Sequence, residues 1–112
     1  MKSKKVEPWG VYVLVPKGRL TGGSETDELK NEIAKVLEQG GTKLVVDLGE
    51  CLYLNSTALG VLISAHKNFI DKNGKMKLCR VGKSIENILV ITRLSLVFEV
   101  FDTEDDAVGS FG

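Results

Sequence analysis

Short apolar runs that alternate with amphipathic helical stretches are the feature that most constrains the fold. Val11–Val15 is β-branched and aromatic, and Leu44–Leu48 is apolar apart from Asp47; both runs are too short for a helix and predict buried strands. Between them lies an apolar stripe at helical spacing, formed by Leu29, Ile33, Val36 and Leu37. Strands that alternate with helices predict an α/β fold with a largely parallel or mixed sheet.

The same reasoning predicts a mixed sheet of about four to five strands with about four helices in a single domain, because 112 residues fit one domain. A strand over 4–7 is expected to pair with Val11–Val15 through a turn at Pro8, and Ser24 is expected to cap the first helix. The remaining expected elements are a loop over 49–54, a helix over 59–70, a strand centred on Leu78, a helix capped by Ser84, a strand over 97–101 and a short helix opened by Thr103. The helix over 59–70 is expected to bury one side, formed by Leu59, Leu62, Ile63, His66, Phe69 and Ile70.

Two adjacent hydroxyl residues stand at the junction between the second apolar run and this helix. The junction reads Asn55-Ser56-Thr57-Ala58-Leu59-Gly60. Asn and Ser are preferred N-caps, so capping alone would explain Ser56. A hydroxyl at a helix N-terminus also lies where free backbone N–H groups and the positive end of the helix dipole favour an added negative charge. Ser56 is therefore a candidate both for a helix cap and for a modified residue.

A wider pattern surrounds this junction. It reads Val45-Val46-Asp47-Leu48, then seven residues, then Ser56-Thr57-Ala58-Leu59-Gly60-Val61-Leu62. The pattern resembles the core signature of the STAS family, whose bacterial members include anti-sigma factor antagonists. The similarity continues through 75–79 as a strand, 84–89 as a helix and 96–98 before an acidic tail, so it spans nearly the whole chain. In that family, the Ser at the position of Ser56 is phosphorylated by a partner kinase, and Thr57 is the neighbouring hydroxyl.

The resemblance implies a single STAS-like domain over residues 1–112 that acts as an anti-sigma factor antagonist. The unphosphorylated form would bind an anti-sigma factor with serine kinase activity and so free a sigma factor for transcription. Phosphorylation of Ser56, which adds roughly −1.5 to −2 charge at pH 7, would break the complex, and a PP2C-like phosphatase would restore it. The partner-binding surface is expected to comprise Arg19, Thr21, Leu54, Asn55, Ser56, Thr57 and Leu59.

The chain departs from the family pattern at three places, and one of them, Asn55, favours an alternative. Asn55 and Ala58 stand where the family usually has Asp and Gly, and residues 18–21 read Gly-Arg-Leu-Thr where it often has Gly-x-(Leu/Ile)-Asp. Asn55 can cap a helix, but it has no carboxylate that could orient a hydroxyl or accept its proton. The alternative is a STAS-like scaffold that no kinase modifies, such as a regulatory subunit of a transport or stress-signalling assembly. A small nucleotide-binding protein is a third hypothesis, from fold analogy alone.

Charge and cysteine content limit the partners and the compartment. The formal net charge is +0, so bulk attraction to nucleic acid or to an anionic membrane is not expected. Residues 67–93 hold seven Lys or Arg against two acids, and 99–106 hold five acids and no base; exposed helix faces and loops account for both, while a basic patch would suit an acidic protein surface. No signal peptide or membrane span is expected, and Cys51 and Cys79 are predicted to be buried reduced thiols, which suits the cytoplasm.

No catalytic constellation can be assembled from the sequence, so enzymatic activity, a metal site and a cofactor are not expected. The lone His66 has no identifiable Ser, Cys or Asp partner and is expected at the edge of the core. Asp47, at the end of a strand, is similar in position to the phosphorylated Asp of a receiver domain. That hypothesis requires an acidic pair after an earlier strand to hold a metal ion, and the first strong strand ends instead in Val15-Pro16-Lys17.

Overall fold

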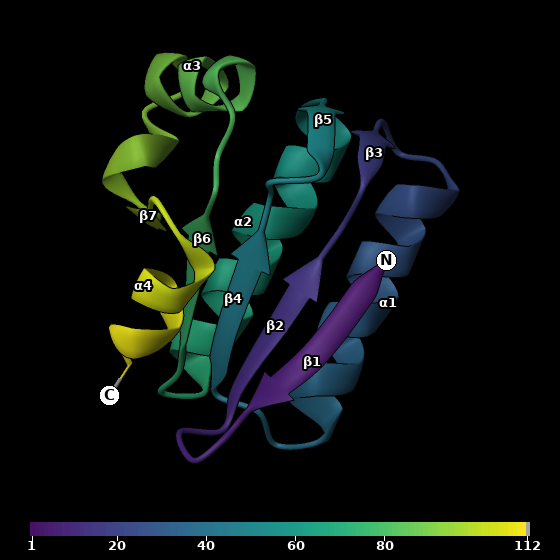
Figure 1. Ribbon diagram of the computed structural model, residues 1–112. Helices are drawn as coiled ribbons and strands as arrows, with labels where there is room; N and C mark the ends of the chain where they lie inside the picture. Colours follow the sequence, from purple (N-terminus) through teal and green to yellow (C-terminus); the bar gives the residue numbers. More distant parts are fainter. Residues whose placement is uncertain (112) are drawn as a thin grey trace.

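A computed structural model describes residues 1–111 and shows one main sheet flanked by helices (Figure 1). The sheet has five strands in the order β1-β2-β4-β6-β7. Their bounds are Lys2–Val6 for β1, Val11–Val15 for β2, Lys43–Asp47 for β4, Lys75–Cys79 for β6 and Glu99–Phe101 for β7. β1 pairs antiparallel with β2, and the other neighbouring pairs are parallel. The predicted mixed α/β sheet is confirmed.

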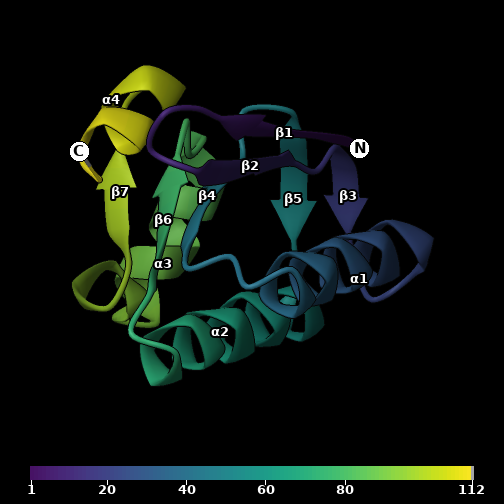
Figure 2. The same ribbon diagram turned by 90° about the horizontal axis from the view of Figure 1, so that it is seen from below.

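The helices cover both faces of the sheet unequally. The two long helices, α1 (Ser24–Glu38) and α2 (Ser56–Asp71), lie side by side on one face, and the short α4 (Glu104–Gly109) lies on the other (Figure 2). The chain returns from β6 to β7 through α3 (Lys83–Ile91) and a 3₁₀ turn, η1 (Leu94–Leu96). Because β4 is covered on both faces, its residues read as a continuous buried run rather than an alternating one.

The hydrophobic core is correspondingly divided by the sheet. The larger cluster packs α1 and α2 against the sheet and includes Leu14, Leu29, Ile33, Leu44, Val46, Leu62, Phe69 and Leu78. The smaller cluster packs α4 against the opposite face and includes Val11, Val13, Val45, Cys79, Ala107 and Val108. Successive residues of β4 therefore point into different clusters, as the pleat of a strand requires.

The segment expected to be a loop over 49–54 is in part a strand. β5 (Cys51–Leu54) pairs in parallel with β3 (Gly18–Leu20), and together they form a separate two-stranded sheet. The expectation of a loop was wrong because these strands are only three and four residues long. Neither has a periodic pattern of its own, and each is stabilised by backbone pairing with a distant segment.

Helix and strand boundaries correct several further expectations. Ser24 and Ser84 are not N-caps: those positions belong to Gly23 and Gly82, neither of which makes a side-chain cap bond. Thr103 is confirmed as the N-cap of α4, where its hydroxyl accepts a hydrogen bond from the Asp106 N–H at 3.0 Å. The last strand begins at Glu99 instead of Val97, because Val97 still has helical dihedral angles at the end of η1 (φ −98°, ψ −47°).

The buried side of α2 is also narrower than the apolar pattern predicts. Ile63 and Ile70 are exposed, at 43% and 51% of their full accessibility. Ala58 and Ala65 are buried instead, beside Leu62 and Phe69. The expected burial of the two isoleucines was therefore wrong, because a helix that lies on a sheet beside another helix buries only a limited stripe.

Candidate functional site

The site forms where the small β3–β5 sheet meets the starts of α1 and α2. β3 is followed by the loop 21–23 and then α1, whereas β5 is followed by Asn55 and then α2. Leu20 and Leu54 are paired in the register of the two parallel strands, so both strands end at the same edge. The backbone N–H of Asn55 extends this pairing and donates to the Leu20 carbonyl at 3.0 Å. Two segments more than thirty residues apart in the sequence are thus joined directly before their helices.

Asn55 is the N-cap of α2. Its Oδ1 accepts a hydrogen bond from the Ala58 N–H at 3.1 Å, and its Nδ2 donates to the carbonyl oxygen of Thr21 at 3.0 Å. The capping role considered for Ser56 therefore belongs to Asn55. Ser56 is the first helical residue of α2, and its side chain is exposed. The hydroxyl is left available at the positive end of the helix dipole.

The loop 21–23 packs against the first turn of α2. Gly22 has φ +94°, a conformation that other residues adopt at a cost, and a β-carbon added there would lie 3.4 Å from Thr57 Cγ2. The Gly22 N–H donates to the hydroxyl of Thr26 at 2.9 Å, and Thr26 is buried in α1. The loop is therefore tied to α1 through Thr26 and to α2 through Asn55.

An exposed aromatic and apolar rim lies beside these loops on the β3–β5 sheet. The Arg19 guanidinium stands over the ring of Tyr53, 5.4 Å from its centroid. Leu52 and Tyr53 expose 70% and 37% of their surface. Sequence reasoning missed both residues because it assigned them to a loop, although two consecutive large side chains before a polar junction were the available signal. Cation–π stacking orders Arg19 while it leaves the charge accessible.

The structure brings most of the predicted site residues together. Arg19, Thr21, Ser56 and Thr57 are exposed around the paired strand ends. Leu54 and Leu59 are buried, at 1% and 7% exposure, so the expectation that they contribute directly to a partner-binding surface needs correction. Both side chains belong to the larger core cluster. They anchor the strand end and the helix that carry the exposed residues.

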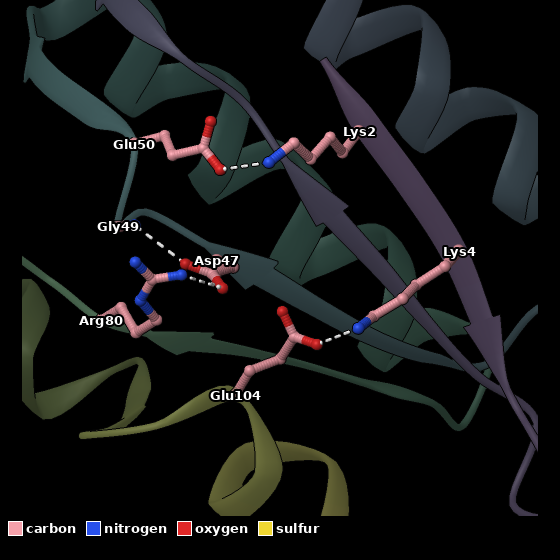
Figure 3. Close-up of polar contacts among 7 residues, drawn as sticks. All are labelled: Lys2, Lys4, Asp47, Gly49, Glu50, Arg80 and Glu104. Atoms are coloured by element: carbon pink, nitrogen blue, oxygen red, sulfur yellow. Dashed lines mark hydrogen bonds and ion pairs between the residues drawn. The ribbon is translucent and has the colours of Figure 1, made fainter.

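A polar cluster around Asp47 holds the turn that leads from β4 into β5 (Figure 3). Asp47 is fully buried; its Oδ1 accepts from the Gly49 N–H at 2.8 Å, and its Oδ2 accepts from Arg80 Nη1 at 3.3 Å. The Arg80 guanidinium packs directly over Gly49, and a β-carbon there would force it to shift. Asp47 thus has a structural role, which disfavours the receiver-like hypothesis.

Two ion pairs connect β1 to the neighbourhood of this cluster. Lys2 pairs with Glu50 at 2.9 Å, and Lys4 pairs with Glu104 of α4 (Figure 3). The hydrogen bond to the Glu104 carboxylate raises the pKa of Lys4, against the opposing effect of burial. These contacts attach the edge strand β1 to both the β4–β5 turn and α4.

The basic and acidic segments noted in the sequence contact each other. Lys75 and Lys77 each pair with Glu99 at 3.4 Å, across the β6–β7 neighbours. Lys77 itself is buried, which corrects the expectation that these charges lie on exposed faces. Its Nζ donates to the Ser110 hydroxyl at 2.7 Å and stands 4.2 Å from the centroid of the Phe111 ring. These lysines therefore do not form a free basic patch.

The remaining residues singled out in the sequence are the lone histidine and the two cysteines. His66 is partly buried, as expected, with its ring edge-on to Phe98 at 5.3 Å between centroids. Cys51 and Cys79 are free and buried, as predicted. Burial raises the pKa of both thiols, that of Cys79 to about 12. Over residues 1–111, no helix has both the length and the apolar character needed to cross a membrane.

Sequence comparison decides the family. Residues 3–107 match the STAS domain. The chain belongs to the STAS family. Among curated STAS-like relatives, the anti-sigma-B factor antagonist of Listeria monocytogenes is 30% identical over 79 residues, which cover 70% of this chain and 68% of the relative. The Bordetella bronchiseptica protein BtrV, a candidate anti-sigma factor antagonist, is 23% identical over 82% of this chain and 79% of its own length.

Solved structures confirm the STAS fold. A candidate anti-sigma factor antagonist from Thermotoga maritima superposes with a TM-score of 0.89 at 22% identity, covering 98% of this chain and 92% of that chain. The anti-sigma factor antagonist SpoIIAA in its unphosphorylated form superposes with a TM-score of 0.77 at 14% identity, covering 97% and 94%. At these identities the likeness establishes the arrangement of strands and helices.

Proposed function

We propose that this STAS protein is an anti-sigma factor antagonist. In this proposal its unphosphorylated form binds an anti-sigma factor with serine kinase activity, and phosphorylation of Ser56 releases it. One observation carries the proposal: Ser56 is exposed at the first position of α2 while Asn55 performs the capping. The Ser56 hydroxyl can be modified without removing the cap bond to Ala58. The names of the curated relatives support the same role.

The proposed switch is local. A phosphate on Ser56 adds about −1.5 to −2 charge at pH 7, and the dipole and free N–H groups of the first helical turn favour that charge. The fold of this chain tolerates the phosphate for that reason. A partner docked over Ser56 instead meets added volume and charge in a desolvated interface, where an unpaired charge is costly. A cytoplasmic PP2C-like phosphatase would return the chain to its binding form.

The exposed residues beside Ser56 suit a protein partner. Leu52 and Tyr53 offer apolar and aromatic surface, and Arg19 offers a cation held over the Tyr53 ring. Aromatic residues and arginine are enriched at protein interfaces, and tyrosine and arginine are common among the residues that carry most of the binding energy. In the proposed complex, the partner covers Ser56 together with this rim.

The test is phosphorylation by a cognate anti-sigma factor kinase with ATP. We expect intact mass to show one phosphate on the wild-type chain and tandem mass spectrometry to place it on Ser56. Ser56→Ala should abolish the modification, and Thr57→Ala, the matched control at the neighbouring hydroxyl, should retain it. Equal phosphate on Ser56→Ala, located at Thr57, would refute the assignment to Ser56.

A STAS-like scaffold that no kinase modifies is the second candidate. The observation that favours it is again Asn55, whose side chain is engaged with Ala58 and Thr21 and carries no carboxylate. A chain that binds the anti-sigma factor kinase, but receives no phosphate from it in the presence of ATP, would fit this scaffold.

A further inference from the structure

Asn55 connects the two segments that form the proposed partner-binding surface. We propose that Asn55 is a positioning residue, whose amide holds the loop 21–23 against α2 so that Thr21 and Ser56 meet a partner as one preassembled surface. The inference rests on the proposed function. It assigns to the Asn55 amide the role of keeping the surface in its binding geometry. It is carried by three of the hydrogen bonds that Asn55 makes, to Leu20, Thr21 and Ala58.

The chemistry of the contacts requires an amide. The Ala58 N–H can only be faced by an acceptor and the Thr21 carbonyl only by a donor, so the orientation of the Asn55 amide is determined by its two partners. An Asp side chain would accept from the Ala58 N–H, but its second oxygen would face the Thr21 carbonyl oxygen and repel it. A Ser hydroxyl caps from a shorter side chain and lacks the second arm. Either substitution keeps a cap and removes the tether.

The loop 21–23 is held by contacts with both helices, and the Asn55 amide supplies the one that reaches Thr21. Gly22, at φ +94°, lies against Thr57, and its N–H is held by Thr26 of α1. The Asn55 amide donates the side-chain hydrogen bond that joins Thr21 to the N-cap of α2. The backbone bond from Asn55 to Leu20 holds the strand end but not the residues after it. Loss of the amide therefore frees Thr21 from the start of α2, while the β3–β5 pairing and the Gly22–Thr26 bond remain.

Preassembly has a predictable effect on binding. A loop that is already ordered loses less conformational entropy when a partner docks, so the tether strengthens binding without any contact between Asn55 and the partner. The chemical step on Ser56 does not involve the tether. Loss of the tether should thus raise KM for phosphorylation and leave kcat unchanged.

The first test needs no partner. Hydrogen exchange of the Gly22 N–H and the Ala58 N–H is measured in the wild type, Asn55→Ser and Asn55→Asp. Both variants keep the Gly22–Thr26 bond but lose the Asn55–Thr21 bond that restrains the same loop, so we expect the loop to open more often and the Gly22 N–H to exchange about fivefold faster. Ala58 exchange should be unchanged, because residue 55 still caps it. Unchanged Gly22 exchange in both variants would overturn the tether, and faster exchange at both amides would show general loosening of the cap instead.

The second test uses the purified anti-sigma factor kinase. We expect Asn55→Ser to weaken binding and raise KM about fivefold at unchanged kcat. Asn55→Asp should bind more weakly still, because it adds a charge. Asn68→Ser, at an exposed position further along α2, is the matched control and should equal the wild type.

The two proposals fail differently. A wild-type chain that neither binds the kinase nor receives phosphate refutes the proposed function and with it the role of the surface, whereas hydrogen exchange still decides the tether. A wild-type chain that binds while Asn55→Ser binds equally well refutes the positioning role. A fall in kcat at unchanged KM would also refute it, because that result would place Asn55 in the chemical step.

Discussion

At the scale of single residues, helix capping and the proposed modification belong to two different side chains. Asn55 caps α2, and Ser56 stands exposed in the first turn. The sequence had left capping and modification as competing roles for Ser56, since both depend on the same position at the helix start. Their assignment to different residues follows from where the helix begins. A helix end can move by one residue without any change in the apolar pattern.

We predict that Ser56→Asp abolishes partner binding while the fold keeps its stability. An acid in the first helical turn is favourable by about 0.3–1 kcal/mol, and no cap bond is lost because Asn55 provides the cap. Binding is measured by calorimetry and stability by thermal unfolding. Ser84→Asp, in the first turn of α3, carries the same charge at another helix start and should bind like the wild type. Unfolding of Ser56→Asp several degrees earlier would show that Ser56 is structural.

At the scale of elements, the turn between β4 and β5 leads the chain into the strand that precedes α2. Asp47 ends β4 in full burial and is held by the Gly49 N–H and by Arg80. Arg80 has φ +54°, so the residue that supplies the guanidinium also occupies a left-handed position directly after β6. Two central strands are thereby joined at the edge from which the chain continues toward Ser56.

We predict that Arg80→Ala destabilises the fold and that Arg80→Gly costs less. Both remove the charged partner of buried Asp47, a loss of about 1–3 kcal/mol. Glycine also relieves the left-handed backbone, by roughly 1 kcal/mol relative to alanine. Free energies of unfolding from urea titration give both differences. Equal stability of Arg80→Ala and the wild type would show that the Gly49 N–H alone satisfies the carboxylate.

At the scale of the whole molecule, opposite charges pair between neighbouring strands, and each face of the sheet buries one thiol. The basic and acidic segments meet at Glu99, where the attraction of Lys77 and Lys75 outweighs the opposing effect of burial and lowers the pKa of Glu99. Buried thiols stand on either side of the sheet, since Cys51 belongs to the larger core cluster and Cys79 to the smaller. The protonated form of each thiol is part of the folded state.

We predict that stability falls as the pH rises above about 9. Burial raises the pKa of Cys79 to about 12 from an ordinary value of 9.0. The unfolded chain therefore releases this proton at a lower pH than the native chain does, and the free energy of unfolding decreases between those values. Urea titrations at about pH 8 and about pH 10 should show a larger loss for the wild type than for Cys79→Ala. Parallel losses would contradict the role of Cys79.

The central strands, the two long helices and the Ser56 junction were predictable from the sequence, because each depends on a local pattern. Val11–Val15 lacks the length for a helix, and the stripe from Leu29 to Val36 has helical spacing. These elements appear close to where that pattern places them. Local preference and burial agree in such segments, so either one is sufficient to find them.

Only the tertiary structure shows that the small sheet exists and which residues it brings together at the site. β3 and β5 are strands because they pair with each other, and no local signal in Gly18–Leu20 or Cys51–Leu54 reports a partner thirty residues away. That pairing brings Arg19 to Tyr53 and Thr21 to Asn55, and it leaves Leu54 in the core. The physical reason is that a backbone hydrogen bond between distant segments, unlike an apolar period, leaves no trace in the residues that make it.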